Sequence, residues 1–302
     1  MSHFTCFTIG DVDNIMEKYN EQDEKYFTPV EEDIDFDVKV FENLNDYPEI
    51  KTRFYEKFTE QSDRESLIKF FEWYEESTPV YKEEDLEVFF KEQKKVFLVE
   101  DGKIKKSFIY YNTNAKYDYY CVIGLDSFAR WGGLEFLMKD GTHAQYGLIK
   151  DLDIDGTINE AIEKDRETYR EVFEGVGRLN HTPWKEYLKR RDNGEITIDE
   201  ARDLYHKQPD IERFNKWAHD NNYWMNADDF LCTEEEYVKD TTFPIFCANI
   251  LGDWFEKGEM GWWACVSNEK EPSVWKEMIE KKLHEIQESH PDEEFHVLDC
   301  HI

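Results

Sequence analysis

The acidic segment KDLDIDGTINE, residues 150–160, contains residue types that carry out phosphoryl transfer and bind metal ions. In one interpretation, Asp153 is the nucleophile and Asp155 the general acid of a phosphatase, with Mg²⁺ held between them. In another, Asp151, Asp153 and Asp155 supply the first ligands of a calcium-binding EF-hand loop. Both interpretations make these aspartates metal ligands, so the flanking residues must decide whether either holds.

The residues around the aspartates favour neither metal site. A phosphatase nucleophile loop follows an apolar strand, but charged residues at 150–151 interrupt the preceding run. The twelfth position of the calcium loop, which requires a bidentate Glu, is Ile162. We therefore expect a turn in which Asp155 or Thr157 caps a helix that begins near Ile158.

Histidines and cysteines near the two ends of the chain form a second candidate metal site. If the terminal strands pair, strand alternation divides these side chains between two faces, so we expect no four-ligand zinc site. The six cysteines include no C-x-x-C pair, which favours reduced, buried thiols. We expect no cofactor. The residues concerned are His3, Cys6, His296, Cys300 and His301.

Length and composition indicate a folded protein with a substantial core. The chain has 302 residues, of which 40% are hydrophobic and 16% aromatic. No apolar run approaches the roughly 20 residues that a membrane-spanning helix needs, so we expect no membrane association. The N-terminal segment lacks the basic and apolar regions of a signal peptide, which predicts a cytoplasmic location in the cell that makes the protein.

Negative charge is the most pronounced feature of the composition. Asp and Glu number 69 against 37 Lys and Arg, which gives a formal net charge of −32. Such a surface repels nucleic-acid phosphates and anionic membranes, so we expect no direct nucleic-acid binding. It can attract a basic partner or occupy a groove built for DNA. The alternative is that the acidity serves solubility alone.

Hydrophobic periodicity predicts strands at both ends of the chain and helices in the middle. Strands are expected over 3–10, 117–124, 134–141, 242–251, 258–268 and 293–302, with a hairpin over 95–111 that turns at Asp101-Gly102. Helices are expected over 49–74, 85–93, 157–190, 197–208, 211–221 and 271–289, with Val274, Ile279, Leu283 and Ile286 on the apolar stripe of the last one.

This order of elements indicates an α+β fold. We expect a mixed or antiparallel sheet built from both termini, together with a helical middle segment. Residues 1–302 are treated as a single α+β domain, with a division into two lobes left open. Within it, residues 157–240 form a mainly helical insert and residues 242–302 a β-β-α-β unit.

Three co-linear segments resemble an uncharacterised protein family of bacteriophages and prophages. They are MSHFTCFTIGD at the N-terminus, NTNAKYDYYCVIG followed by RWGGLEFLMKDG in the centre, and WFEKGEMGWWACVSNEKEPSVWKEMI followed by VLDCHI at the C-terminus. Members of that family carry N-P-N-A-K-W-D-W-Y-x-x-G-G-R-W in mid-chain and G-E-M-G-W-W-G near the end, and they finish on D-C-H-I.

This sequence departs from the family pattern at two places. The aromatic residues of W-D-W-Y are Tyr117, Tyr119 and Tyr120 here, which is a like-for-like change. The family's tight G-G-R-W turn is replaced by Gly124, LDSFA and then Arg130, which puts a shared role of Arg130 in doubt. The family also has K-x-D-I-D at the position of residues 150–155 without a required G-T, so the resemblance does not support a phosphatase.

The resemblance implies a phage origin but no known activity. Together with the charge, it favours an accessory protein that binds and inhibits a bacterial defence complex, such as the nuclease systems Gabija or CRISPR, in the host bacterial cytoplasm. An acidic face that mimics DNA is one route to such occlusion. The alternative is a metal-dependent hydrolase or nucleotide-processing enzyme, and a homo-oligomer stays open.

A shared binding site, if there is one, is expected where the matched segments meet. We assign no catalytic residue, and the metal candidates stay Asp151, Asp153 and Asp155. The aromatic residues there can equally serve to stabilise the fold. The candidate binding residues are Asp118, Tyr120, Arg130, Trp131, Glu259, Trp262, Trp263, Asp299 and His301.

Overall fold

The computed structural model describes residues 3–32, 78–85, 95–100, 103–130, 134–260 and 265–302. The chain divides into two compact units. The first comprises Met1–Ile15 and Cys121–Cys300, and the second comprises Met16–Tyr120 and His301–Ile302. The helices expected over 49–74 and 85–93, and the turn at Asp101-Gly102, lie outside the described residues.

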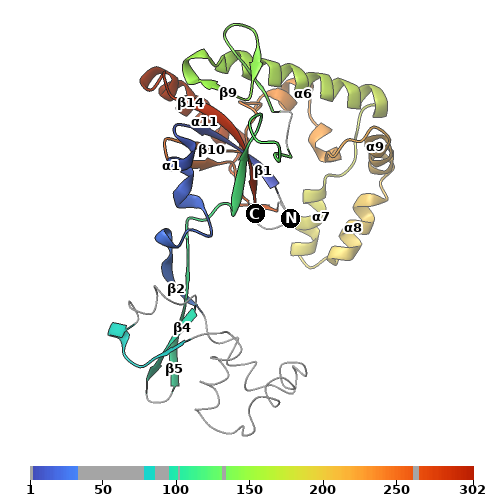
Figure 1. The fold of residues 1–302 in the computed structure, drawn as a ribbon. Coiled ribbons are helices and arrows are strands. Elements are labelled where there is room, and N and C mark those ends of the chain that lie inside the picture. The colour runs from blue at the N-terminus through green and yellow to red at the C-terminus, as the bar shows by residue number, and fades with distance from the viewer. Residues whose placement is uncertain (1–2, 33–77, 86–94, 101–102, 131–133, 261–264) are drawn as a thin grey trace. The chain divides into compact units, whose positions relative to one another are not determined.

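The main sheet contains strands from both ends of the chain (Figure 1). Its order is β11-β10-β1-β14-β6, and β9 also pairs with β14. Because β1 runs parallel to β10 while β10 and β11 are antiparallel, the sheet is mixed, which confirms the predicted fold class. The strands are β1 (His3–Ile9), β6 (Tyr119–Val122), β9 (Tyr146–Leu148), β10 (Cys247–Ile250), β11 (Asp253–Glu256) and β14 (Glu294–His301).

One face of this sheet packs against helix α11 (Pro272–Ser289). The alternation of β1 directs Phe7 and Ile9 to this face, where they are fully buried. The predicted apolar stripe of α11 was wrong at one position, because Val274 is 53% exposed and Trp275 is buried instead. Trp275 precedes Ile279 by one helical turn, so the buried stripe begins there.

The middle of the chain is helical, as predicted. The helices are α6 (Ile154–Val176), α7 (Trp184–Asp192), α8 (Ile198–His206), α9 (Pro209–Asp220) and α10 (Glu234–Val238). The helical segment predicted over 157–190 consists of two helices, α6 and α7, with a break over 177–183. Gly177 ends α6 with φ of 78°, a conformation that favours glycine, and Pro183 precedes the first residue of α7.

Side chains at the helix starts explain the remaining boundaries. Thr197 and Glu200 form a reciprocal capping box at α8, and Thr233 and Glu236 form another at α10. Pro209 occupies the first turn of α9, a position where proline is favoured. These helices enclose a second core that includes Val172, Val176, Ala201, Ile211, Phe214 and Phe230.

Several expected strands are shorter than the sequence pattern indicates. The strand over 134–141 is reduced to β7 (Phe136–Leu137), which pairs with β8 (His143–Ala144). Of the strand expected over 258–268, residues 261–264 lie outside the described residues, and the described part contains β12 (Glu259–Met260) and β13 (Val266–Ser267), which pair antiparallel. Short helical segments are α1 (Val12–Met16), η1 (Glu17–Tyr19), η2 (Glu24–Tyr26), η4 (Glu83–Asp85), η5 (Ile149–Asp151) and η6 (Ala227–Phe230).

The second unit contains a four-stranded sheet of order β2-β5-β4-β3. The predicted hairpin over 95–111 is confirmed, because β4 and β5 pair antiparallel. The strands are β2 (Thr28–Glu32), β3 (Thr78–Val80), β4 (Lys95–Glu100) and β5 (Lys103–Tyr111). Among the described residues of both units, no helix has the length and apolarity required to cross a membrane.

Candidate functional site

Asp153, the proposed nucleophile or metal ligand, is a helix cap. Its side chain accepts a hydrogen bond from the backbone N–H of Gly156 at 2.8 Å and occupies the N-cap position of α6. A turn that caps a helix was predicted, but the cap was expected at Asp155 or Thr157. The correction moves the start of the helix to Ile154, because a carboxylate at the N-cap satisfies the free N–H groups of the first turn.

The neighbouring aspartates do not converge on a metal position. Asp155 lies in the first turn of α6, with its carboxylate 3.3 Å from Nε2 of His284, and Asp151 lies in η5. Throughout the part of the chain that is described, no three His, Cys, Asp or Glu side chains are arranged to hold a metal ion. The role that the structure shows for Asp153 is therefore to cap helix α6.

In the second unit, three of the predicted or adjacent residues come together. Nδ1 of His301 lies 2.6 and 2.8 Å from the two carboxylate oxygens of Asp118, and the ring of Tyr119 stacks on His301 at 4.6 Å between centroids. Tyr120 makes an edge contact with Tyr117. These contacts join Asp118 and Tyr119 to His301 near the end of the given sequence, so this set stabilises the local fold.

In the first unit, Asp299 is buried and fully engaged. One carboxylate oxygen lies 2.8 Å from Nδ1 of His3, and the other accepts the backbone N–H of Arg130 at 2.7 Å. Only the backbone of Arg130 takes part, and its side chain is exposed. The guanidinium thus has no role in this arrangement, which agrees with the altered turn that precedes it.

The remaining predicted residues do not join these sets. Glu259 lies in β12 and accepts a hydrogen bond from the side chain of Asn268 at 2.8 Å. None of the contacts found among the described residues links Glu259 to Asp299. Trp131, Trp262 and Trp263 lie outside the described residues. The described members of the nine predicted residues therefore lie in separate sets and do not form one site.

Helix α6 carries a stripe of exposed carboxylates that the sequence analysis missed. Its members recur at intervals of three or four residues, which places them on one face of the helix. Over 14 residues, at 1.5 Å per residue, the stripe is about 21 Å long. The spacing was readable from the sequence as a 3-4-4-3 repeat. We call these residues the α6 acidic stripe: Glu160, Glu163, Glu167, Glu171 and Glu174, all exposed.

Contacts at the ends and middle of the stripe hold some of its carboxylates in place. Glu160 lies 2.9 Å from Nε2 of His143, and Glu163 lies 3.4 Å from Nε of Arg166. Glu171 accepts a hydrogen bond from the hydroxyl of Tyr223. The stripe is therefore a row of exposed carboxylates with a net negative charge, and the exposed Lys164 lies on the same face between Glu160 and Glu167.

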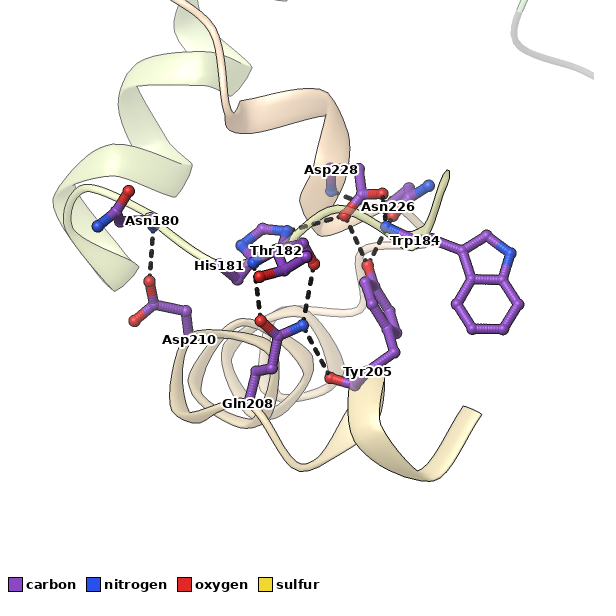
Figure 2. Close-up of polar contacts among 9 residues, drawn as sticks. All are labelled: Asn180, His181, Thr182, Trp184, Tyr205, Gln208, Asp210, Asn226 and Asp228. Atoms are coloured by element: carbon purple, nitrogen blue, oxygen red, sulfur yellow. Dashed lines mark hydrogen bonds and ion pairs between the residues drawn. The ribbon is translucent and has the colours of Figure 1, made fainter. Parts of the chain in front are cut away.

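A buried polar network anchors the helices beyond α6 (Figure 2). Asp228 accepts from the backbone N–H of Trp184 at 2.7 Å and from the hydroxyl of Tyr205 at 2.8 Å. The same carboxylate lies 2.8 Å from Nε2 of His181, whose side chain is 0% exposed. Burial and the bond to Asp228 raise the pKa of Tyr205.

This network is a structural anchor between helices, because its polar groups bond to one another. Nδ1 of His181 is buried and has no hydrogen-bond partner among the described residues, so the carboxylate of Asp228 holds the ring proton on Nε2. Gln208 adds two bonds to the backbone of Thr182, at 2.7 and 3.0 Å (Figure 2). The result fixes the segment between α6 and α7 against α8 and η6.

Two aromatic side chains on hydrogen-bonded loops are highly exposed to solvent. Phe128 is 86% exposed on the loop that replaces the family's tight turn, where Asp126 accepts the backbone N–H of Val122 at 2.6 Å. Trp224 is 94% exposed on the connection between α9 and η6. Large exposed aromatic residues are frequent anchors in protein–protein interfaces. Composition alone could not have distinguished these two from the buried aromatic residues.

The three cysteines on neighbouring strands of the main sheet form a buried thiol cluster. Cys6 pairs in register with Cys247, and Cys300 is also in contact with Cys6. Burial by itself raises the pKa of Cys6, but hydrogen bonds with the other two thiols outweigh it and lower the pKa to about 6. All six cysteines are free, and Cys265 is the exposed one.

Comparisons with other proteins do not assign the chain to a group. No protein-family model matches it. No curated protein and no solved structure matches it either. The resemblance to a phage family therefore stays a prediction, and the functional argument rests on the residues of this chain.

Proposed function

We propose that the chain is a phage accessory protein that binds and inhibits a bacterial defence complex of the nuclease type by stoichiometric occlusion. The observation that supports this most strongly is the α6 acidic stripe, Glu160 to Glu174, on the exposed face of a 23-residue helix. A straight row of carboxylates resembles one strand of a nucleic-acid backbone in charge and direction. A basic DNA-binding groove is the surface that such a row complements.

The spacing of the stripe suits this role. Five carboxylates over about 21 Å place one charge every 5 Å or so along the axis. One DNA strand carries a phosphate about every 3.4 Å of axis, so the stripe has more than half of that charge density. The longer reach of glutamate side chains lets each carboxylate adjust to the lysines and arginines of a groove.

The charge of the whole chain supports the same partner class. A net charge of −32 attracts a basic surface and speeds the encounter with it at low salt. At physiological salt this attraction is weak beyond the Debye length of about 8 Å. Nucleic acid and anionic membranes are repelled by the same field. A basic protein is therefore the partner that this surface selects.

The alternative function, a metal-dependent hydrolase, has no support among the described residues. Asp153 caps α6, and Asp155 faces His284. His181 and Asp228 are arranged like a catalytic pair, but the imidazole is buried in the network that holds α7 and α8. No contact among the residues that the structure describes favours a particular reaction.

The test uses purified nuclease-type defence complexes, such as Gabija and CRISPR effectors, immobilised with and without duplex DNA. We expect stoichiometric binding that competes with DNA and weakens as salt rises. The test variant carries Glu163→Gln, Glu167→Gln and Glu174→Gln, which leaves the contacts of the other two stripe residues intact. The matched control removes three exposed charges from α11 by Glu277→Gln, Glu285→Gln and Glu288→Gln.

Surface charge contacts contribute up to about 1 kcal/mol each, so the stripe variant should bind roughly 10 to 100 times more weakly. The α11 variant should retain most of its affinity. Two results would overturn the proposal: no binding to any complex together with unchanged phage plating on defended hosts, or equal losses in the two variants. The second result would reduce the stripe to a contributor of net charge.

A further inference from the structure

A pocket of about 790 Å³ lies beside the connection between α9 and η6. Its wall includes Trp224, Tyr205 and Tyr237, and its polar groups include Asp229 and the asparagine side chains of the connection. The described residues that line the pocket include no Lys, Arg or Glu. The carboxylate of Asp229 is the one acidic group among them. The pocket is thus aromatic and carries one negative charge.

The loop that presents Trp224 is held firmly at its base. The backbone N–H of Tyr223 donates to the carbonyl of Ala218 at 2.8 Å, and the ring of Tyr223 stacks on Trp217 at 5.2 Å between centroids. The hydroxyl of Tyr223 donates to Glu171 of the α6 acidic stripe. Trp224 therefore stands 94% exposed on an ordered support, next to the acidic stripe.

Asp229 is set to receive a positive charge. The pKa of its carboxyl is raised, first because neighbouring atoms displace water around it and second because of the charge on Asp228. The side chain is nevertheless open to the pocket, and among the described residues it makes no ion pair. A cation that enters the pocket relieves both causes at once, because it supplies the opposite charge that the protein does not.

We propose that this pocket binds the guanidinium group of an arginine side chain, with Trp224 covering the planar face and Asp229 accepting its N–H groups. An arginine is favoured over a lysine because its planar and weakly hydrated head stacks on aromatic rings and forms paired hydrogen bonds with a carboxylate. An anion is disfavoured because the described lining residues include the carboxylate of Asp229 and no Lys or Arg. The wall also contains two histidines, His206 and His219.

The inference deepens the function proposed above, because a basic nuclease groove supplies arginines. The identity of the partner rests on that proposed function, whereas the preference for a guanidinium rests on the pocket alone. The bond between Tyr223 and Glu171 places the pocket at the stripe, so one arginine can anchor a groove whose other basic residues face the carboxylates of α6.

The test is a titration of the full-length protein at pH 8, followed by the NMR signal of the Trp224 indole N–H. That signal is identified by its loss in Trp224→Phe. The probe is Nα-acetyl-arginine N-methylamide, and its control is the citrulline analogue, which has the same shape without the charge. We expect the arginine probe to shift the indole signal. The citrulline analogue should bind at least about tenfold more weakly than the arginine probe.

Two variants separate the contributions of the pocket. Asp229→Asn and Trp224→Ala should each weaken binding of the arginine probe at least about fivefold, while Phe128→Ala, which removes another highly exposed aromatic residue on a different loop, should leave it unchanged. Far-ultraviolet circular dichroism and the melting temperature show whether each variant is folded. No shift at 50 mM probe, or equal binding of arginine and citrulline, would overturn the inference.

The same experiment distinguishes its own failure from failure of the proposed function. If arginine binds the pocket but no defence complex is retained, the pocket stands and the partner class falls. If a complex is retained and Trp224→Ala binds it as well as the wild type does, the stripe stands and the pocket has no part in recognition. If the unaltered protein binds neither the arginine probe nor a defence complex, both proposals are overturned.

Discussion

Replacing Asp228 by Asn should destabilise the first unit strongly, although the change is a single atom in size. Asp228 accepts hydrogen bonds from Trp184 and Tyr205 and lies against Nε2 of His181, at distances of 2.7 to 2.8 Å. An amide presents one acceptor oxygen and one donor nitrogen, so one side of the network loses its acceptor whichever way the amide turns.

The magnitude follows from those three contacts. The favoured orientation keeps the oxygen toward Tyr205 and His181 and leaves the N–H of Trp184 facing another donor. An unsatisfied donor in a partly buried site costs about 1–3 kcal/mol, and the two retained bonds weaken because the acceptor is no longer charged. We therefore expect a loss of about 2–4 kcal/mol in the free energy of unfolding, and a fall of about 5 to 10 °C in the melting temperature.

The assay is urea-induced unfolding followed by far-ultraviolet circular dichroism, with hydrogen exchange of the Trp184 amide as a local readout. The control is Asp229→Asn, the same change at the adjacent residue, which takes no part in the network. A loss below about 0.5 kcal/mol for Asp228→Asn, or equal losses for the two variants, would refute the reasoning. Either result would mean that the network is not what holds α7 and α8 in place.

Three further predictions follow from the same structure. Folding raises the pKa of Asp229, so protonation of this carboxyl favours the folded state. The stability from this residue is therefore present at low pH and is lost as pH rises through the folded pKa. Asp229→Asn should melt above the wild type at pH 7, and the difference in melting temperature should shrink as pH falls toward 4. Asp153→Ala should cost about 1 kcal/mol in urea unfolding as a lost helix cap, and Mg²⁺ or Ca²⁺ should leave the melting temperature of both proteins unchanged, whereas a rise in the wild type alone would restore a metal site. In the native protein, N-ethylmaleimide should modify the exposed Cys265 first and reach Cys6 only after unfolding, despite its lowered pKa, and mass spectrometry of partially labelled protein that showed Cys6 modified as fast as Cys265 would contradict this.

Local signals in the sequence were sufficient for much of the fold. The pairing of a strand at each terminus in one sheet, the helix that begins at Pro272 and the hairpin of β4 and β5 were all predicted. Periodicity and capping act over a few residues, so each helix or strand can be predicted from its own segment of the sequence. Errors arose where packing decided between neighbouring positions, as at Trp275, which is buried in place of Val274.

The candidate site was less accessible to prediction, for two different reasons. The α6 acidic stripe was present in the sequence as a repeat of Glu at three- and four-residue intervals, but its exposure depended on which face of α6 packs against the second core. Glu171 and Tyr223 are separated by 52 residues, and only the tertiary structure places them in contact. No local pattern predicts such a pair.

By itself, the sequence determined the negative charge, the strand and helix periods, and the helix caps, because these depend on residue type and short-range spacing. The tertiary structure decided which aromatic residues stayed outside, which carboxylate was buried in a network and which faced a pocket. Asp228 and Asp229 are adjacent and chemically identical, yet one anchors three groups and the other makes no ion pair among the described residues. That difference comes from segments distant in the chain, because burial and hydrogen bonding are set by whatever folds against a side chain.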